Sequence, residues 1–411
     1  MKISFLTGIT LAGLFLSCAD KQIQLTVHAD HYGRTDCVVS ADVSKIVSNK
    51  SVGVALYEQA DGRKKAVTSQ LVTEQDGKSV LYWTLDGATP AGTTRTYIAH
   101  RAEKVTESQA AMSVEDTYKS LIIRKNGDPV LQYYYALMEA PEGVDPAFGR
   151  SGFIHPAWSP AGNVLTNIQP EDHRHHYGIW NPWTHIVYDG KLYDLWNLGD
   201  KLGTVRARSV ETIYRGDVFS GFTALLDHVI FTPEGEKVIM NEHWNIRAWN
   251  AGDGFLWDFE SDLAPSTALP VLLQAYRYAG FGYRATSEWT KENCEMLTSE
   301  GKTRQEIDGT RARWIFITGS TATGRSGLLF LGHPDNHNAP EPLRIWDENA
   351  NGGRGDAFIN FAPTKNEDWE LLPDKEYVLK YRIYAFEGNM TAGEAERLWN
   401  DFAHPPRVTI K

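Results

Sequence analysis

Five histidines fall within 31 residues, from His155 to His185, and form the part of the sequence richest in chemically reactive groups. An imidazole titrates near neutral pH, so it can donate a proton, accept one or bind a metal. Proline and glycine interrupt this stretch repeatedly, which predicts loops, and loops on a rigid scaffold commonly carry catalytic groups. We therefore expect His175 or His176 to act as the general acid or base.

Indoles and polar side chains of the same stretch suit a saccharide. Trp180 and Trp183 offer flat apolar faces on which the C–H patches of a sugar ring can stack. Polar groups beside such faces fix the orientation of a ligand, so we predict substrate contacts from His155, Asp172 and His173.

Two other interpretations of the stretch stay open. The histidines can cap turns while the tryptophans fill the core, as both residue types often do. Alternatively, His173 and His175 bind a transition metal, with Asp172 as a ligand or partner, although the sequence has no HExxH motif. The favoured prediction needs no metal or other cofactor.

A predicted long hairpin over residues 222–232 and 237–249 contributes a carboxylate. Apolar residues alternate onto one face of its second strand, and Glu242 lies among them. A buried carboxylate there has a raised pKa and can act as general acid or base. Pairing of Glu242 with an arginine is an equal alternative. His228 and Asp227, on the first strand, are predicted to face the same groove.

Two later segments add polar groups. Arg277 or Arg284, in an aromatic and glycine-rich segment, can bind hydroxyl or carboxylate groups of a substrate, although its glycines equally fit a bulge. His333 ends a predicted strand and is a candidate acid or base, and Asn336 a candidate substrate contact. Residues 344–346 and 360–363 are predicted to form the rim of this site.

The N-terminus has the pattern of an export signal. Lys2 precedes an apolar run over residues 3–16, which is too short to span a bilayer comfortably. The following Leu16-Ser17-Cys18 resembles a bacterial lipobox, so residues 1–18 are predicted to be a signal peptide with Cys18 as the lipid anchor. An ordinary signal peptide is the alternative. We expect a periplasmic or outer-membrane lipoprotein that meets the membrane only through this anchor.

The bulk composition narrows the function classes. The 411 residues are 42% hydrophobic and 23% charged, which is ordinary for a globular protein. The net charge of −11 and the lack of a basic run exclude nucleic acid as an expected partner. Cys37 and Cys294 are too few for a disulfide framework, and we predict no bridge between them.

Strand patterns predict an all-β protein in two parts. Short strands with Asp-Gly turns over residues 19–112 predict a small Ig-like β-sandwich. Residues 113–411 have longer strands and many aromatics, which favours a large antiparallel sandwich. A short C-terminal helix is expected after Thr391, because Glu394 three residues later completes a capping box.

The segment from Ser151 to Trp180, which includes the pattern DHRHHYG, resembles the PmoA-related family of exported bacterial proteins. Matches at 332–336 and 360–363 extend the resemblance, which covers roughly residues 115–400. It implies a fold similar to the galactose-mutarotase supersandwich, where sugars bind in a concave groove and a histidine and a carboxylate do acid–base work. Methane oxidation is rejected, because no apolar stretch after residue 16 is long enough to span a membrane.

These observations together predict an exported lipoprotein that cleaves or isomerises a carbohydrate. Two alternatives are a glycan-binding lipoprotein without catalysis and a metal-dependent oxidoreductase.

Overall fold

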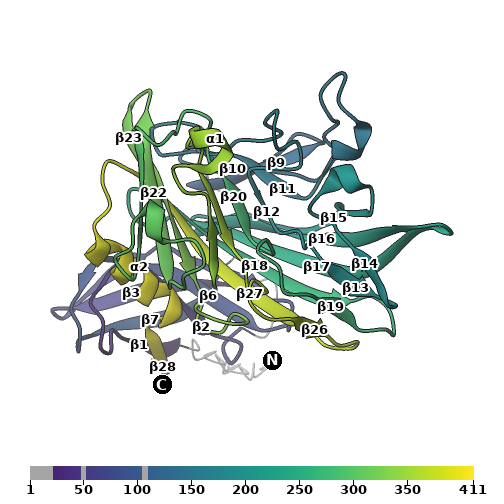
Figure 1. The fold of residues 1–411 in the computed structure, drawn as a ribbon. Helices are drawn as coiled ribbons and strands as arrows, with labels where there is room; N and C mark the ends of the chain where they lie inside the picture. The colour runs from purple at the N-terminus through teal and green to yellow at the C-terminus, as the bar shows by residue number, and fades with distance from the viewer. Residues whose placement is uncertain (1–21, 48–51, 104–109) are drawn as a thin grey trace, which may run out of the picture.

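The structure is a computed structural model that describes residues 22–47, 52–103 and 110–411. Cys18 and the predicted signal peptide lie outside the described residues. Figure 1 shows a small β-sandwich beside a much larger body of long strands.

The small sandwich packs two antiparallel sheets against each other. Its core contains Leu25, Trp83 and Tyr97, which are fully buried. In spatial order, one sheet has β28 (Arg407–Ile410), β1 (Gln22–His28), β7 (Thr94–Glu103), β3 (Val52–Ala60) and β4 (Arg63–Val67). The other has β2 (Arg34–Asp42), β6 (Ser79–Thr89) and β5 (Ser69–Thr73).

The end of the chain completes this first sandwich. Strand β28 pairs with β1, with Val27 opposite Val408, so the C-terminus lies beside β1 (Figure 1). The predicted second part, residues 113–411, includes β28, whereas the structure places this strand in the small sandwich. Local patterns cannot reveal such a pairing, because its partners are almost 400 residues apart.

The large body is built on two antiparallel sheets of eight strands each, counted over the described residues. The first contains, in order, β24 (Leu343–Ile345), β25 (Phe358–Phe361), β20 (Gly282–Arg284), β12 (Ile179–Trp180), β11 (Phe153–Ala157), β10 (Asp128–Tyr134), β9 (Ser120–Lys125) and β8 (Met112–Asp116). The second contains β15 (Gly203–Tyr214), β16 (Phe219–Thr232), β17 (Gly235–Trp249), β18 (Phe255–Pro265), β27 (Tyr377–Glu387), β23 (Gly324–Gly332), β22 (Trp314–Thr321) and β21 (Cys294–Thr298).

Short elements complete the fold. A smaller sheet holds β14 (Lys191–Tyr193), β13 (Ile186–Tyr188), β19 (Val271–Leu273) and β26 (Trp369–Leu371). The helical elements are α1 (Ala350–Gly353), α2 (Ala392–Ala403) and the 3₁₀ turns η1 (Pro146–Phe148), η2 (Leu198–Asp200) and η3 (Arg304–Glu306).

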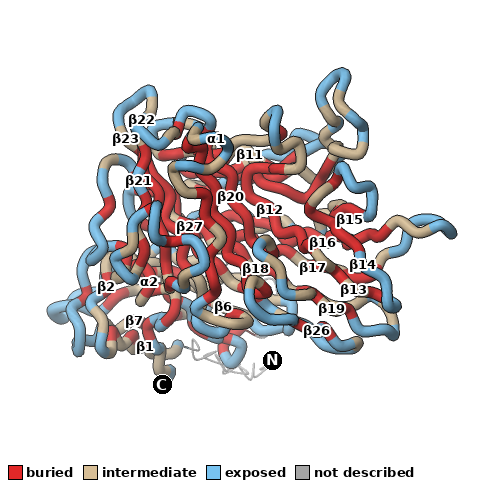
Figure 2. The backbone as a smooth tube through the Cα atoms, in the orientation of Figure 1, coloured by how far each residue is buried: buried red, intermediate tan, exposed pale blue. Residues whose placement is uncertain are grey.

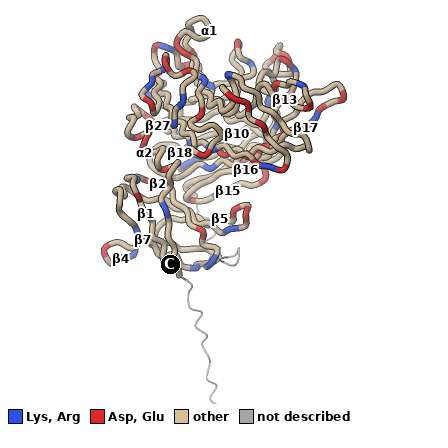
Figure 3. The backbone as a smooth tube through the Cα atoms, turned by 60° about the horizontal axis from the view of Figure 1, so that its bottom comes forward, with Lys and Arg blue, Asp and Glu red and all other residues tan. Residues whose placement is uncertain are grey.

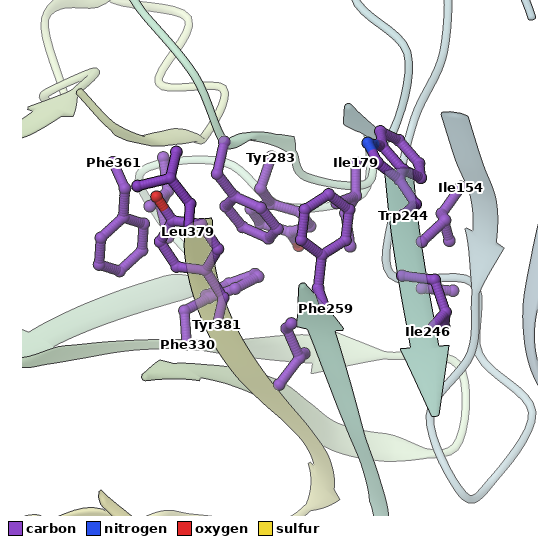
Figure 4. Packing of buried hydrophobic residues seen from close by; sticks show 14 of the residues in the cluster. Ile154, Ile179, Trp244, Ile246, Phe259, Tyr283, Phe330, Phe361, Leu379 and Tyr381 are labelled. Atoms are coloured by element: carbon purple, nitrogen blue, oxygen red, sulfur yellow. The ribbon is translucent and has the colours of Figure 1, made fainter. Parts of the chain in front are cut away.

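The main core lies between the two large sheets. Strand faces that alternate inward bring large apolar side chains together, and Figure 4 shows Phe259, Tyr283 and Tyr381 meeting there. Figure 2 shows buried backbone running through the middle of the body and exposed backbone in the outer loops. Each fully buried aromatic side chain contributes roughly 2–3 kcal/mol through burial, so this core dominates stability.

Helix α2 covers the outer face of β22 and β23. Thr391 caps it by accepting a hydrogen bond of 3.2 Å from the Glu394 amide, as the sequence predicts. Leu398 and Trp399 then pack against Phe316 and Leu331. The predicted fold class, antiparallel β with a short C-terminal helix, is confirmed.

Surface charge and hydropathy are unremarkable in the described residues. Acidic and basic positions are interspersed in the view of Figure 3. Of the helices within the described ranges, none is long and apolar enough to cross a membrane. Cys37 and Cys294 are buried free thiols, in agreement with the predicted absence of a bridge between them.

Candidate functional site

Three predicted imidazoles converge in the loop before β12. The ring centroids of His173 and His176 are 4.9 Å apart, and the centroid of His175 lies 4.8 Å from His176 and 5.7 Å from His173. We call these three residues the histidine cluster. The rings of these three histidines therefore lie together.

Tight turns produce this arrangement. The amide of His173 donates to the carbonyl of Pro170 at 3.0 Å, and the amide of His176 donates to the carbonyl of His173 at 2.9 Å. Gly178 ends the loop with φ of +58°, and a Cβ there would lie 2.3 Å from the Ile154 carbonyl oxygen. Only glycine allows the loop to approach β11 this closely.

Aromatic rings form the walls of the cluster. Trp346 lies 4.7 Å from His173 and 5.4 Å from His176, measured between ring centroids. Trp180 lies 5.1 Å and Phe358 5.2 Å from His176. The side chain of Trp180 is fully buried, so a sugar cannot stack on it in this conformation.

A tyrosine links the predicted Arg277 to this wall. The hydroxyl of Tyr278 accepts hydrogen bonds of 3.1 Å from Trp346 Nε1 and from Arg344. The guanidinium of the exposed Arg277 lies 5.3 Å from the Tyr278 ring centroid. Tyr278 is half-buried, so it offers a partly exposed aromatic face at the rim.

Ion pairs hold a glycine-rich segment next to the cluster. We call residues 350–356, which include α1, the glycine-rich strap. Arg354 in the strap pairs with Asp172 and, at 2.9 Å, with Asp356. Asp356 also pairs with the buried Arg284, whose guanidinium lies 4.7 Å from the Trp346 ring. Figure 1 shows α1 near β10 and β20, the sheet that carries the cluster.

Burial keeps two imidazoles neutral. It lowers the pKa of His175 to about 4, with further lowering by His173, Arg150 and Arg284. Burial also lowers the pKa of His176 well below its ordinary value. Both rings are therefore neutral near pH 7 and can accept a proton.

The aspartate of the site stays ionised. Burial alone would raise the pKa of Asp172, but hydrogen bonding by Arg354 and His173 outweighs it and leaves the pKa below its usual value. A carboxylate oxygen of Asp172 lies 2.9 Å from His173 Nδ1. This contact brings the carboxylate of Asp172 next to the His173 imidazole.

Other predicted residues lie away from the cluster. The indole of Trp183 is fully buried in the main core, 5.8 Å from the Trp369 ring, and offers no face for stacking. His155 lies on β11, and its Nδ1 is 2.8 Å from the hydroxyl of Thr166. Burial lowers the pKa of His155 to about 4.

Glu242 is buried on the inward face of its strand, as the alternation of residues predicts, and its partners are not arginines. It accepts hydrogen bonds from Asn181 at 2.6 Å, Ser261 at 2.6 Å and Trp244 at 2.7 Å, and it lies 2.9 Å from His228 Nε2. Its side chain has no exposed surface. The alternative pairing with an arginine is therefore wrong. His228, on the partner strand, thus contacts Glu242 as predicted. Asp227, on the same strand, does not, and accepts hydrogen bonds from Arg208 and Asn241.

His333 and Asn336 lie at a second location, beside a cavity separate from the histidine cluster. The ring centroid of His333 lies 5.1 Å from that of Phe402 on α2. The charged groups that shift the pKa of His333 differ from those that shift the pKa of His176. A cavity of about 130 Å³ lies there, lined by His333, Glu341 and Trp399 among others. Asn336 donates to Glu341 at 3.1 Å. Burial raises the pKa of Glu341 to about 7.

Several residues of the cluster's surroundings were missed by sequence reasoning. Tyr278, in the loop between β19 and β20, and Phe358, on β25, reach it from distant segments. The Arg354–Asp356 pair lies in a segment that the sequence shows only as a glycine-rich turn. Spacing carries no signal for such contacts, since the partners come together only through the sheet order. Arg284 and Trp346 were noted as substrate-contact and rim candidates, and both lie here.

The favoured prediction, a site without a cofactor, and the alternative, a transition metal at His173 and His175, both stay predictions. Across the ranges that the structure describes, no three His, Cys, Asp or Glu side chains are arranged to hold a metal ion.

These features define an antiparallel β protein with a histidine-rich site beside a glycine-rich strap. The chain belongs to a family of unknown function, DUF6807, whose model matches residues 120–400. The match covers the histidine cluster, the strap and the cavity at Glu341. No curated protein matches the chain.

Two solved structures show distant likeness. One is a galactose mutarotase related enzyme from Lactobacillus acidophilus, at 8% identity over 68% of this chain and 100% of that one, with a TM-score of 0.33. The other is a TPR-domain containing protein from Parabacteroides distasonis, at 11% identity over 88% of this chain and 57% of that one, with a TM-score of 0.22. Both TM-scores are too low to carry an argument about fold or function.

Proposed function

We propose that the chain acts on carbohydrate by acid–base chemistry at the histidine cluster. The observation that carries this proposal is the meeting of three imidazoles, two of them neutral by burial, at a place that solvent still reaches. The His173 side chain is 24% exposed and that of Asp172 is 31% exposed. Of the two neutral imidazoles, that of His175 is itself partly exposed, so it is the proton acceptor available to a bound substrate.

Each residue then has a role. His175 accepts the proton, and His173, oriented by Asp172, returns one. His176 is more deeply buried and positions the other two rings. Tyr278 presents the aromatic face at the rim, where Trp180 and Trp183 were expected.

Export and anchoring belong to the same proposal. The Leu16-Ser17-Cys18 pattern supports a lipid-anchored protein of the cell envelope, and the residues that resemble the PmoA-related family fall mostly within the matched range. In this proposal Asp172 takes the place of the acid–base partner expected from Glu242 or His333.

The test is a glycan panel with product analysis. The purified chain, the His175→Ala variant and the His243→Ala variant are incubated with oligosaccharides, and products are identified by mass spectrometry. His243 is a matched control, because it lies half-exposed on β17 near Glu211. We expect conversion by the native chain and the control, and at least a hundredfold loss in His175→Ala.

Full activity of His175→Ala would overturn the assignment of His175. Binding of a glycan without any conversion would instead establish the non-catalytic alternative.

A further inference from the structure

Two buried arginines near the histidine cluster carry donors that no acceptor satisfies. Arg150 is 1% exposed, and its one printed contact is a long one of 3.4 Å to the Leu195 carbonyl. Its Nε and Nη2 have no acceptor among the described residues. Arg284 is 3% exposed, and although one nitrogen pairs with Asp356, its Nε and Nη1 lack an acceptor within the same ranges. Buried charges without partners are costly, usually by several kcal/mol.

Both guanidinium groups lie near the histidine cluster. Arg150 contacts the Leu195 carbonyl, and the ring of the next residue, Trp196, lies 6.4 Å from the His176 ring between centroids. The charges of Arg150 and Arg284 each lower the pKa of His175. The Arg284 guanidinium also lies over Trp346, the ring that contacts His173 and His176. A group placed beside His175 therefore lies within the field of two cations.

The carboxylates nearby are already engaged. Asp356 accepts hydrogen bonds from Arg284, Arg354 and Asn351, and Asp172 accepts one from Arg354. Asp172 and Asp356 are thus taken up by Arg284, Arg354 and Asn351. The carboxylate whose charge acts on Arg150 is that of Glu242, which accepts its hydrogen bonds from other groups.

We propose that this site takes an acidic carbohydrate, a sugar unit that bears a carboxylate, and that Arg284 and Arg150 bind this carboxylate next to His175. This inference rests on the proposed function and adds the substrate class. A carboxylate supplies the acceptors that the two guanidinium groups lack. Nε and Nη2 of Arg150 share one edge and can bind it as a pair, whereas Nε and Nη1 of Arg284 each offer a single donor. The sugar ring remains at the rim, over the half-buried face of Tyr278.

Recognition of the carboxylate also suits the chemistry of the neutral imidazole. Cations that neutralise a carboxylate make the hydrogen on the adjacent carbon easier to remove. His175 takes this proton, the electron pair of the broken C–H bond is delocalised onto the carboxylate, and a proton returned by His173 to the same carbon completes an isomerisation.

The experiment compares matched ligands on the full native chain. Isothermal titration calorimetry measures binding of oligogalacturonate, oligomannuronate and oligoglucuronate, and of the same oligomers after chemical reduction of the carboxyl groups. We expect at least one acidic oligomer to bind tenfold or more tightly than its reduced form, with affinity that falls as salt is added.

The outcomes separate this inference from the proposed function. Equal binding of acidic and reduced oligomers, or binding of the reduced forms alone, overturns the acidic substrate class and leaves carbohydrate binding in place. Absence of binding by every oligomer, acidic and neutral, overturns both.

A variant adds a second test. Arg284→Lys keeps the charge but removes the free Nε and Nη1 donors, so it should weaken the binding of acidic oligomers about tenfold and leave that of reduced oligomers unchanged. Arg206→Lys on β15, where Arg206 pairs with Glu236 at the surface, is the matched control. The native comparison decides the question if Arg284→Lys does not fold.

Discussion

Replacement of His175 by glutamine should change how the protein responds to acid. Burial lowers the pKa of His175 from 6.5 to about 4 in the folded state, whereas the unfolded chain has the ordinary value. Between these two values the unfolded chain binds a proton that the folded protein does not bind. Stability is therefore retained above pH 6.5 and is lost as the pH falls toward 4.

The size of this effect follows from the same difference. About 2.5 pH units at about 1.36 kcal/mol each give about 3 kcal/mol of acid-induced destabilisation from His175 alone. Glutamine does not titrate, so His175→Gln should lose about 3 kcal/mol less than the native protein over this window. His155, whose lowered pKa is caused by burial alone, contributes equally to both proteins and cancels.

Urea unfolding followed by tryptophan fluorescence measures the difference between about pH 4 and about pH 8. Of the 13 tryptophans, only Trp83 lies in the small sandwich, so fluorescence reports the large body that holds the site. His31→Gln, at an exposed turn of the small sandwich, controls for loss of an imidazole. Parallel stability curves for native protein and His175→Gln would refute a neutral, buried His175.

Three further predictions concern the carboxylates. Burial raises the pKa of Glu341 from 4.5 to about 7, so the folded protein holds this proton more tightly and loses stability as the pH rises through that window. The free energy of unfolding of Glu341→Gln should thus rise by about 3 kcal/mol relative to that of the native protein between about pH 4 and about pH 8, measured by urea titration. A difference between the two proteins that does not change with pH would contradict this. Glu242→Ala should cost about 3–5 kcal/mol in the same assay, because it leaves His228 and three other buried groups without their acceptor; a loss under about 1 kcal/mol would show that the network is dispensable. Arg354→Ala should raise the pKa of Asp172 in a ¹³C NMR titration and change stability by at most about 1 kcal/mol, whereas an unchanged Asp172 pKa would rule out the pairing.

The sequence predicted the features that local pattern encodes. Alternation placed Glu242 on the inward face of the β16–β17 hairpin, and the capping pattern placed the start of α2. The short spacing of His173, His175 and His176 was enough to bring their rings together, since turns act over a few residues.

Contacts between distant segments could not be predicted in this way. Trp180 and Trp183 are three residues apart, yet one lies against the histidine cluster and the other in the main core. His333 looked like a partner of His176, but the order of the sheets separates them. Sheet order depends on long-range pairing, which no single segment specifies.

The central claim is that carbohydrate meets the protein at the histidine cluster. The most direct measurement is an NMR titration of the histidine side chains with an oligosaccharide that binds, using histidine-labelled protein and single substitutions for assignment. The account predicts saturable shifts of the His173 and His175 signals, with the His31 and His243 signals unmoved. Shifts confined to His333, or bound ligand that leaves His173 and His175 unaffected, would contradict it.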